Sequence, residues 1–311
     1  MASLYALDMI SKTELAEIFG STQLAVGTPG GAEKAVHLLQ AAMESGPADS
    51  CLLAPDFKNA FGSVRRTKIM DGILQHDALK PLYRYSHWLL SRPSTLVLQD
   101  PSCKVVSTFL CAEGIRQGCV AGPLFFGAAT LGAYKEVQRA CPEVTFTSIL
   151  DDCPSVGTAV QLRKVAEVLE RETAPLGLVL NRDKTRVLWP RTSAAPADTA
   201  HIGFPVVTGS MVVLGTPLGM SRLSNAGTSR KLHETLQEHL DFFAALQHPL
   251  MPAQTALHLA RASGLPRVNY LSRTMAPSEL TPLLTVFDET LLDAVLTKLK
   301  LPKPIAGQPE P

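Results

Sequence analysis

The chain has 311 residues, of which 46% are hydrophobic and 18% are charged, with a formal net charge of +1. This length and apolar content predict one large or two modest globular domains with a sizeable buried core. The near-neutral charge excludes a global basic field for nucleic-acid binding, and six cysteines without a C-x-x-C pair argue against a zinc site or a secreted disulfide framework.

The first third of the chain predicts helices and one hairpin. Apolar periodicity and turn residues predict a helix over 32–43, one or two helices over 69–90, and a short strand over 51–54. Strands over 95–99 and 105–111 are predicted to be joined by the turn Asp100-Pro101-Ser102. The N-terminus lacks a basic start followed by an apolar block, so no signal peptide is predicted. Two charge-free stretches, 117–134 and 201–221, contain Gly, Pro and polar residues, and no membrane segment is expected.

The rest of the chain first alternates strands and helices and then becomes helical. The patterns predict a helix over 122–140, a strand over 144–150, a helix over 160–173, a hairpin over 205–215 turning at Thr208-Gly209-Ser210, and helices over 228–246, 253–262 and 280–299. Four prolines in the last eleven residues predict a disordered tail over 301–311.

Two acidic segments follow predicted strands. Asp56 comes after the strand 51–54, and Asp151 and Asp152 come after the strand 144–150. At a hairpin tip both adjacent acids can gather near one point, and clustered carboxylates repel one another unless a cation is bound. Oxygen ligands favour Mg²⁺ or Mn²⁺, and two ions about 4 Å apart serve polymerases and nucleases. The alternative interpretation is a set of solvated loop acids.

Four stretches carry a longer pattern. They are 56–61 (DFKNAF), like D-x-x-N-A-F; 114–124 (GIRQGCVAGPL), like G-x-x-Q-G-D-P-x-G-P-L; 149–152 (ILDD), like Y-x-D-D; and 177–184 (GLVLNRDK), like G-L-x-L-N-x-x-K. In this order they resemble the palm of a reverse transcriptase, an RNA-directed DNA polymerase, and most closely that of non-LTR retroelements. The resemblance covers roughly 23–220, because QLAVGTPGG is similar to the stretch before such a palm and VLGTPLG to the hairpin that grips the primer.

The resemblance implies a fold and a domain division. The fold class is α+β, with a polymerase palm, an antiparallel sheet backed by helices, followed by an all-helical thumb. The division places a palm with partial fingers over 1–220, a thumb-like region over 221–300 and the tail over 301–311. Only 22 residues precede the QLAVGTPGG stretch, so the finger region that clamps the triphosphate is expected to be largely missing.

The resemblance also implies catalytic roles. Asp56 and Asp151 would hold two Mg²⁺ or Mn²⁺ ions, and Asp152 would support this metal site from its edge. Lys184 would stand near the pyrophosphate leaving group and offer it charge or a proton. Taken alone, without the motif, Lys184 is better interpreted as an exposed surface lysine.

A second set of residues is implied for nucleotide binding. Phe57 and Phe61 follow the first acid, and Phe61 would lie under the sugar of the incoming nucleotide, where a ring excludes a 2′-OH. Gln117 and Gly118 would lie along the templating base pair, because glycine permits close backbone approach. The alternatives are a core phenylalanine and an ordinary loop turn.

Several residues depart from the family pattern. Ile149 replaces an aromatic residue, and Cys119 and Val120 replace Asp-Pro. Pro55 and Pro154 each remove a backbone donor beside a strand, which strand ends or bulges tolerate. None of these changes removes an implied metal ligand.

The implied function is template-directed DNA synthesis from dNTPs on an RNA or DNA template with a primer, in the nucleus or cytoplasm. The alternatives are an inactive remnant that binds nucleic acid or protein, and a metal-dependent phosphohydrolase. Basic residues that could contact phosphates, or equally lie on solvated helix faces, are Arg65, Arg66, Lys68, Arg230, Lys231, Arg261, Arg267 and Arg273.

Overall fold

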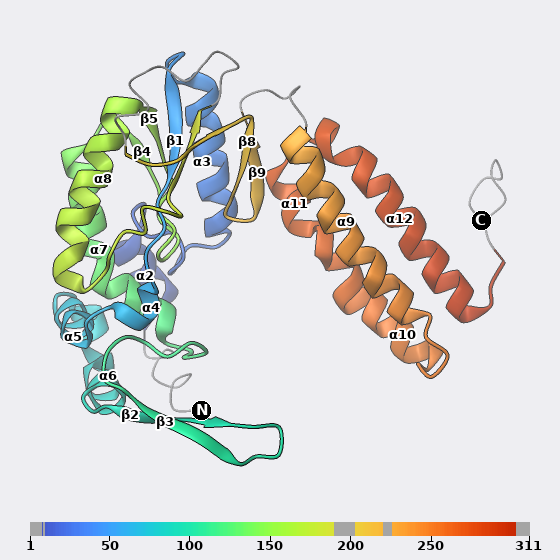
Figure 1. Ribbon diagram of the computed structural model, residues 1–311, viewed down its shortest axis with the longest axis horizontal. Helices are drawn as coiled ribbons and strands as arrows, with labels where there is room; N and C mark the ends of the chain where they lie inside the picture. The colour runs from blue at the N-terminus through green and yellow to red at the C-terminus, as the bar shows by residue number, and fades with distance from the viewer. Residues whose placement is uncertain (1–7, 9, 190–202, 220–225, 303–311) are drawn as a thin grey trace. The chain divides into compact units, whose positions relative to one another are not determined.

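The structure is a computed structural model that describes residues 8, 10–189, 203–219 and 226–302, without the side chains of 226–233 and 235. The chain divides into two compact units, 1–208 and 209–311 (Figure 1). The expected tail from residue 303 onward and the basic pair at 230 and 231 therefore lie outside the described residues or side chains.

The first unit is built on a five-stranded sheet with the order β4-β5-β1-β6-β7. Its strands are β1 (Ser50–Ala54), β4 (Thr145–Phe146), β5 (Ser155–Thr158), β6 (Arg186–Trp189) and β7 (Val206–Thr208). The central strand β1 pairs antiparallel with β5 and β6, while β6 and β7 pair in parallel. The expected α+β class with a mainly antiparallel sheet is confirmed.

Both faces of β1 are covered by other elements. This agrees with its run Cys-Leu-Leu, which is apolar without the alternation typical of a strand with one solvent-exposed face. Cys51 and Leu53 belong to a core cluster that also contains residues of α8 (Ala159–Thr173) and α7 (Gly122–Ala140). Leu52 points to the opposite face and is also fully buried. On that side α3 (Gly31–Ser45) lies against β1 and β5 (Figure 1).

A long hairpin extends from the first unit. After α4 (Ala60–Ser63), α5 (Arg66–Leu74), a 3₁₀ turn (Asp77–Leu82) and α6 (Tyr83–Leu90), the chain forms β2 (Ser94–Gln99) and β3 (Val105–Cys111). The two strands pair only with each other within the described part of the chain, as the sequence predicts. Large apolar side chains of both strands are exposed, among them Val97, Val106, Phe109 and Leu110.

The expected strand over 144–150 is shorter than predicted. Only Thr145–Phe146 forms a strand, which pairs with Val156 and Ser155 of β5. Beyond it, Ser148 accepts a backbone hydrogen bond from Leu24 (2.8 Å) rather than from a strand of the sheet. The segment 22–24 thus takes the place of a neighbouring strand.

The predicted hairpin over 205–215 is wrong. Val206–Thr208 adds to the large sheet as β7, and the hairpin forms instead between β8 (Ser210–Val213) and β9 (Thr216–Gly219). The chain turns at Leu214 and Gly215, which both have positive φ (49° and 78°), as the two central residues of a tight hairpin turn require.

The second unit combines this hairpin with helices. They are α9 (Ala226–Leu246), α10 (Ala253–Leu259) with a π-helical turn (Ala260–Gly264), a 3₁₀ turn (Leu265–Val268), α11 (Asn269–Thr274) and α12 (Pro277–Leu299). Phe243 and Phe287 are fully buried and meet edge to face at 5.2 Å. The three helices predicted here are present, with α10 ending earlier than expected.

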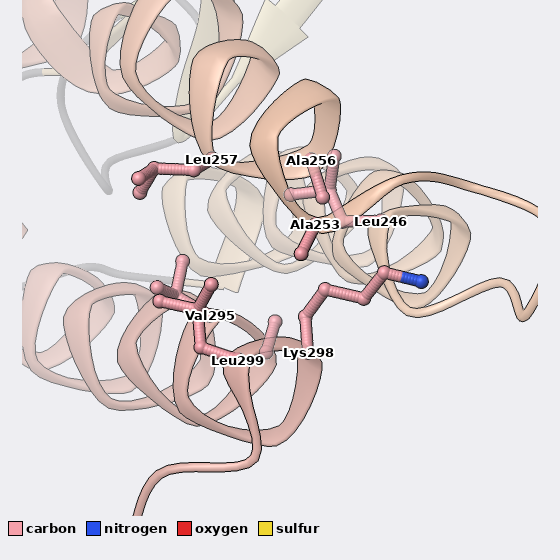
Figure 2. Close-up of a pocket in the computed structure, with 8 residues that line it drawn as sticks. Leu246, Ala253, Ala256, Leu257, Val295, Lys298 and Leu299 are labelled. Atoms are coloured by element: carbon pink, nitrogen blue, oxygen red, sulfur yellow. The ribbon is translucent and has the colours of Figure 1, made fainter.

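A small apolar pocket lies in this helical unit between α10 and α12 (Figure 2). Leu246, Ala253, Ala256, Leu257, Val295 and Leu299 line it. Lys298 lies at its edge, where Nζ donates a hydrogen bond to the carbonyl of His248 (2.7 Å). The pocket is therefore a packing gap without a polar group directed into it.

Candidate functional site

Asp56 lies just beyond the end of β1 and is fixed through its backbone. Its N–H donates to Thr185 Oγ1 (3.1 Å), and its carbonyl accepts from the N–H of Asn181 (2.7 Å). The next residue, Phe57, forms an isolated antiparallel bridge with Leu180. The segment that carries Asp56 is thus held against 180–185, and its own carboxylate is half-buried.

Asp151 and Asp152 occupy the tight turn expected from the sequence. The N–H of Ile149 donates to the carbonyl of Asp152 (2.7 Å), and the N–H of Asp152 donates back to the carbonyl of Ile149 (3.1 Å). Leu150 and Asp151 are the two central residues, and Leu150 has φ of 59°. The two acids therefore stand at a tight turn closed by the isolated Ile149–Asp152 bridge.

The two prolines flanking these acids are accommodated. Pro55 lies outside β1, whose last paired residue is Ala54, opposite Arg186. Pro154 precedes β5, and its carbonyl accepts from the N–H of Thr147 (3.2 Å). Neither position requires an N–H for sheet pairing.

The charges of these acids act on one another. Burial raises the pKa of Asp151, and the negative charge of Asp56 raises it further. The pKa of Asp152 rises to about 6, first because of burial and then because of the charges of Asp151 and Asp56, although Asp152 keeps solvent access. Carboxylates from two segments 95 residues apart in sequence therefore share one electrostatic environment.

The donor chemistry of these acids fits a divalent cation, although their arrangement does not form a closed cage. Carboxylate oxygens are the ligands that Mg²⁺ and Mn²⁺ prefer, and a bound cation would offset the mutual repulsion. Among the described residues, no three His, Cys, Asp or Glu side chains are gathered closely enough to hold a metal ion. The fit therefore rests on charge and ligand type.

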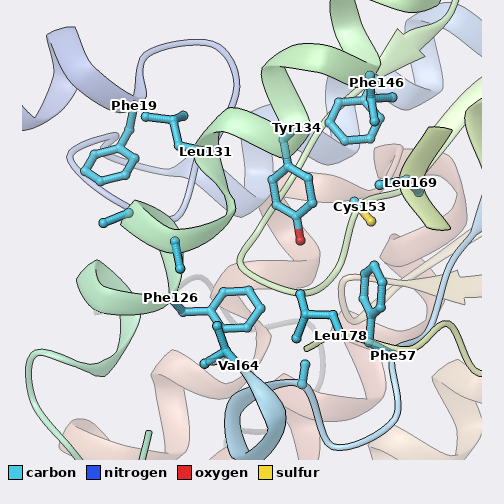
Figure 3. Close-up of a cluster of buried hydrophobic side chains, with 14 of the residues drawn as sticks. Phe19, Phe57, Val64, Phe126, Leu131, Tyr134, Phe146, Cys153, Leu169 and Leu178 are labelled. Atoms are coloured by element: carbon cyan, nitrogen blue, oxygen red, sulfur yellow. The ribbon is translucent and has the colours of Figure 1, made fainter. Parts of the chain in front are cut away.

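The two phenylalanines implied for nucleotide binding differ in exposure. Phe57 is 6% exposed and belongs to the core cluster, in which Figure 3 shows its ring beside Leu178. Its ring supports the sheet, so a nucleotide contact would come from its backbone. Phe61 on α4 is half-buried and stacks on Phe126 of α7, with ring centroids 4.6 Å apart. One face of Phe61 is thus already occupied.

Gln117, Gly118 and Lys184 lie on exposed loops. Gly118 has φ of 84° and no heavy atom within 4 Å of the place where a Cβ would stand. Glycine is therefore required there by backbone conformation and not by close packing within this chain. The N–H of Lys184 donates to the carbonyl of Asn181 (3.1 Å), so its loop is connected to the segment of Asp56.

Sequence reasoning missed three polar residues that support the acids. Thr185 is fully buried and accepts from Asp56, while Gln23 and Tyr134 are fully buried and bond to Leu150. A glutamine at the head of the apolar run QLAV and a tyrosine within an apolar helix are signals for Gln23 and Tyr134, whereas no sequence pattern marks Thr185.

One expected phosphate contact is wrong. The side chain of Arg66 is 7% exposed, and its guanidinium donates to the carbonyls of Gly114, Arg92 and Cys111 inside the protein. It is a buried structural residue and has no free donor group aimed at solvent-borne phosphate. Its neighbour Arg65 is exposed.

Sequence comparison identifies a similar protein of a retrotransposable element. No protein-family model matches the chain. The chain is 27% identical over 289 residues to the "Retrotransposable element SLACS 132 kDa protein" of Trypanosoma brucei gambiense, an alignment that covers 93% of this chain and 23% of that protein. The resemblance to a reverse transcriptase domain is confirmed. This reverse transcriptase-like chain thus spans about a quarter of the length of the relative it matches.

Two solved structures share the reverse transcriptase-like fold. The telomerase of Candida tropicalis in its apo form matches with a TM-score of 0.51 over 95% of this chain and 55% of that chain. The telomerase of Candida albicans, in complex with a fragment of telomeric RNA, matches with a TM-score of 0.50 over 95% of this chain and 51% of that chain. Both are 11% identical in sequence, so the likeness concerns the fold. No described helix combines the length and apolar composition needed to cross a membrane.

Proposed function

We propose that the chain performs template-directed DNA synthesis, RNA-templated and with deoxynucleoside triphosphates as substrates. The observation that carries the proposal is the electrostatic coupling of Asp56 with Asp151 and Asp152 in a fold shared with telomerase structures. Single acids at loop ends are common, but an acid on one segment whose charge raises the pKa of two acids on another segment, in this fold, points to nucleotidyl transfer.

In this proposal each residue takes the role that the resemblance implies. Asp56 and Asp151 are the ligands for two Mg²⁺ or Mn²⁺ ions, with Asp152 at the edge of the site. When bound, such ions activate the primer 3′-OH and stabilise the departing pyrophosphate. Lys184, exposed on the loop attached to the Asp56 segment, offers positive charge to the leaving pyrophosphate.

The nucleotide-facing residues complete the assignment. Phe61, backed by Phe126, presents its free side under the sugar, and Phe57 supports this surface from the core. Gln117 and Gly118 line the templating base pair from their exposed loop, which leaves both free to contact a duplex. The template and primer would bind largely through their phosphates, so affinity would fall with salt.

A second candidate is a binding module without catalysis. This candidate needs no metal site, and no three His, Cys, Asp or Glu side chains are gathered as a metal cluster among the described residues. In this case the fold would bind an RNA or DNA duplex, and no nucleotide would be incorporated.

Primer extension on an RNA template with Mg²⁺ or Mn²⁺ separates the two. We expect incorporation by the wild-type chain and its loss in Asp151→Asn, with unchanged activity in Asp77→Asn, whose carboxylate pairs with Lys80 on the surface. Duplex binding without incorporation would support the binding module. Hydrolysis of nucleotides without a template would instead indicate a phosphohydrolase.

A further inference from the structure

The turn that carries Asp151 contains an unfavourable backbone conformation. Leu150 has φ of 59°, in the left-handed region that side chains with a Cβ seldom adopt. Residues held in such conformations persist when their surroundings fix them, and they cluster at functional sites. The groups that fix Leu150 therefore determine where the following residue, Asp151, is held.

The first of these groups is the side-chain amide of Gln23. Its Oε1 accepts from the N–H of Leu150 (2.8 Å), and its Nε2 donates to the carbonyl of Leu150 (3.3 Å). Gln23 is 0% exposed, so no water competes for these bonds. One amide thus binds both backbone groups of the strained residue, and the carbonyl that it binds belongs to the peptide bond leading to Asp151.

Tyr134 is the second group. Its hydroxyl donates to the same carbonyl of Leu150 (2.9 Å), and the residue is 0% exposed. Figure 3 shows its ring near Phe146, with the hydroxyl directed away from that ring toward the interior of the cluster. The Leu150 carbonyl therefore accepts two hydrogen bonds, which fill both of its lone pairs.

The segment around Gln23 is itself fixed to Ser148, two residues before Leu150. The N–H of Leu24 donates to the carbonyl of Ser148 (2.8 Å), and Ser148 Oγ donates to the carbonyl of Thr22 (2.5 Å). Gln23 Oε1 also accepts from the N–H of Ala25 (3.3 Å). Residues 22–25 thus form a rigid support that aligns the amide with Leu150 before any substrate binds.

We propose that Gln23 is a positioning residue that, together with Tyr134, holds the strained Leu150 turn so that the Asp151 carboxylate stands ready at the active site. The chemistry of this role rests on the proposed nucleotidyl transfer. Glutamine suits the position because a neutral amide donates and accepts at once, whereas methionine does neither and an ionised glutamate only accepts.

The first test measures the turn and needs no enzymatic activity. Amide hydrogen exchange of Leu150, followed by NMR, should be at least tenfold faster in Gln23→Met than in the wild-type chain, after correction for global unfolding. In Gln23→Glu the protection factor of Leu150, taken relative to the intrinsic exchange rate at each pH, should rise as the pH is lowered, because a protonated carboxyl donates and accepts as the amide does. Unchanged exchange at Leu150 in Gln23→Met would overturn the proposal.

The second test measures catalysis. In primer extension, Gln23→Met and Tyr134→Phe should lower kcat at least tenfold with KM for the nucleotide unchanged. The matched control is Val168→Ala, which removes apolar packing from buried α8 without touching the turn. Val168→Ala and Gln23→Met are compared at temperatures where both are equally far below their Tm. If Val168→Ala then lowers kcat as much as Gln23→Met does, Gln23 acts only through stability and the proposal is wrong.

The two proposals fail in different ways. A wild-type chain that incorporates no nucleotide would refute the proposed synthesis, while the exchange of Leu150 would still decide whether Gln23 holds the turn. If Gln23→Met does not fold, Tyr134→Phe, which removes one hydroxyl, and Gln23→Glu carry the same exchange test, and unchanged exchange at Leu150 in both would overturn the proposal.

Discussion

Arg66 gives the sharpest test of the structural reasoning, because the sequence offers a phosphate contact or a solvated helix face for it, whereas the structure buries its guanidinium. Its guanidinium donates to four carbonyls: Gly114 (3.0 Å), Arg92 (3.1 Å), Cys111 (3.2 Å) and Leu90 (3.4 Å). These carbonyls belong to the end of α6, to the base of the β2–β3 hairpin and to the loop before Gln117. Arg66→Met should therefore loosen the hairpin and that loop together.

The magnitude follows from these bonds. A hydrogen bond to a charged group contributes about 1.5–3 kcal/mol, and a buried carbonyl left without a donor costs about 1–3 kcal/mol. Two of the four bonds are longer than 3.1 Å, and water can reach the carbonyls nearest the exposed hairpin, so we expect a loss of about 4 kcal/mol in the free energy of unfolding, below the sum of the individual terms. For a unit of about 200 residues this lowers Tm by about 8–16 °C. Arg66→Lys should lose about half, because an ammonium cannot span the fork of carbonyls.

Urea unfolding measures the stability, and salt-dependent binding of an RNA–DNA duplex measures the phosphate contacts. The matched control is Arg65→Met, which removes a neighbouring exposed guanidinium. The reasoning would be refuted if Arg66→Met left the unfolding midpoint unchanged while it weakened duplex binding and reduced its dependence on salt.

Two further predictions concern single buried groups. Thr185→Val removes the acceptor of the Asp56 N–H and should lower the free energy of unfolding, measured in urea, by about 1–3 kcal/mol. Thr185→Ser keeps the hydroxyl and should retain most of this stability. Equal losses of stability in the two variants would contradict the prediction. In the second unit, burial and the positive charge of Arg267 lower the pKa of His239, against an opposing effect of Glu238, so the unfolded state binds the proton more tightly. The stability of that unit should therefore fall as pH drops below about 6.5, and thermal melts of His239→Gln should lose this pH dependence; a variant that keeps it would show that another group is responsible.

The motifs could be predicted from the sequence, because each combines residue types that serve one local geometry. Asp56 and the pair Asp151-Asp152 stand at the strand end and hairpin tip that their neighbours predict. The predicted strand over 144–150 is longer than the observed one, because Ser148 forms hydrogen bonds with the segment 22–24 instead of with a strand of the sheet. No local sequence pattern indicates this long-range pairing.

The hairpin error has a similar cause. Thr208-Gly209-Ser210 has ideal turn composition, and yet Val206–Thr208 finds a parallel partner in β6, so the turn forms at Leu214-Gly215 instead. Arg66 shows the same limit for charge: a basic cluster in the sequence does not indicate which of its members the fold buries. Local composition indicates which residues can form a turn or carry a charge, but contacts between distant segments determine where the turn forms and which charged side chain is buried.

The β2–β3 ribbon has a consequence for handling the protein. Its two strands bond only to each other within the described part of the chain, and each outer edge leaves a row of unpaired backbone donors and acceptors flanked by exposed Val97, Val106 and Leu110. Such an edge is a template on which another chain can add strand by strand. Concentrated solutions of this protein should therefore lose solubility first through this ribbon, ahead of any unfolding of the sheet or the helices.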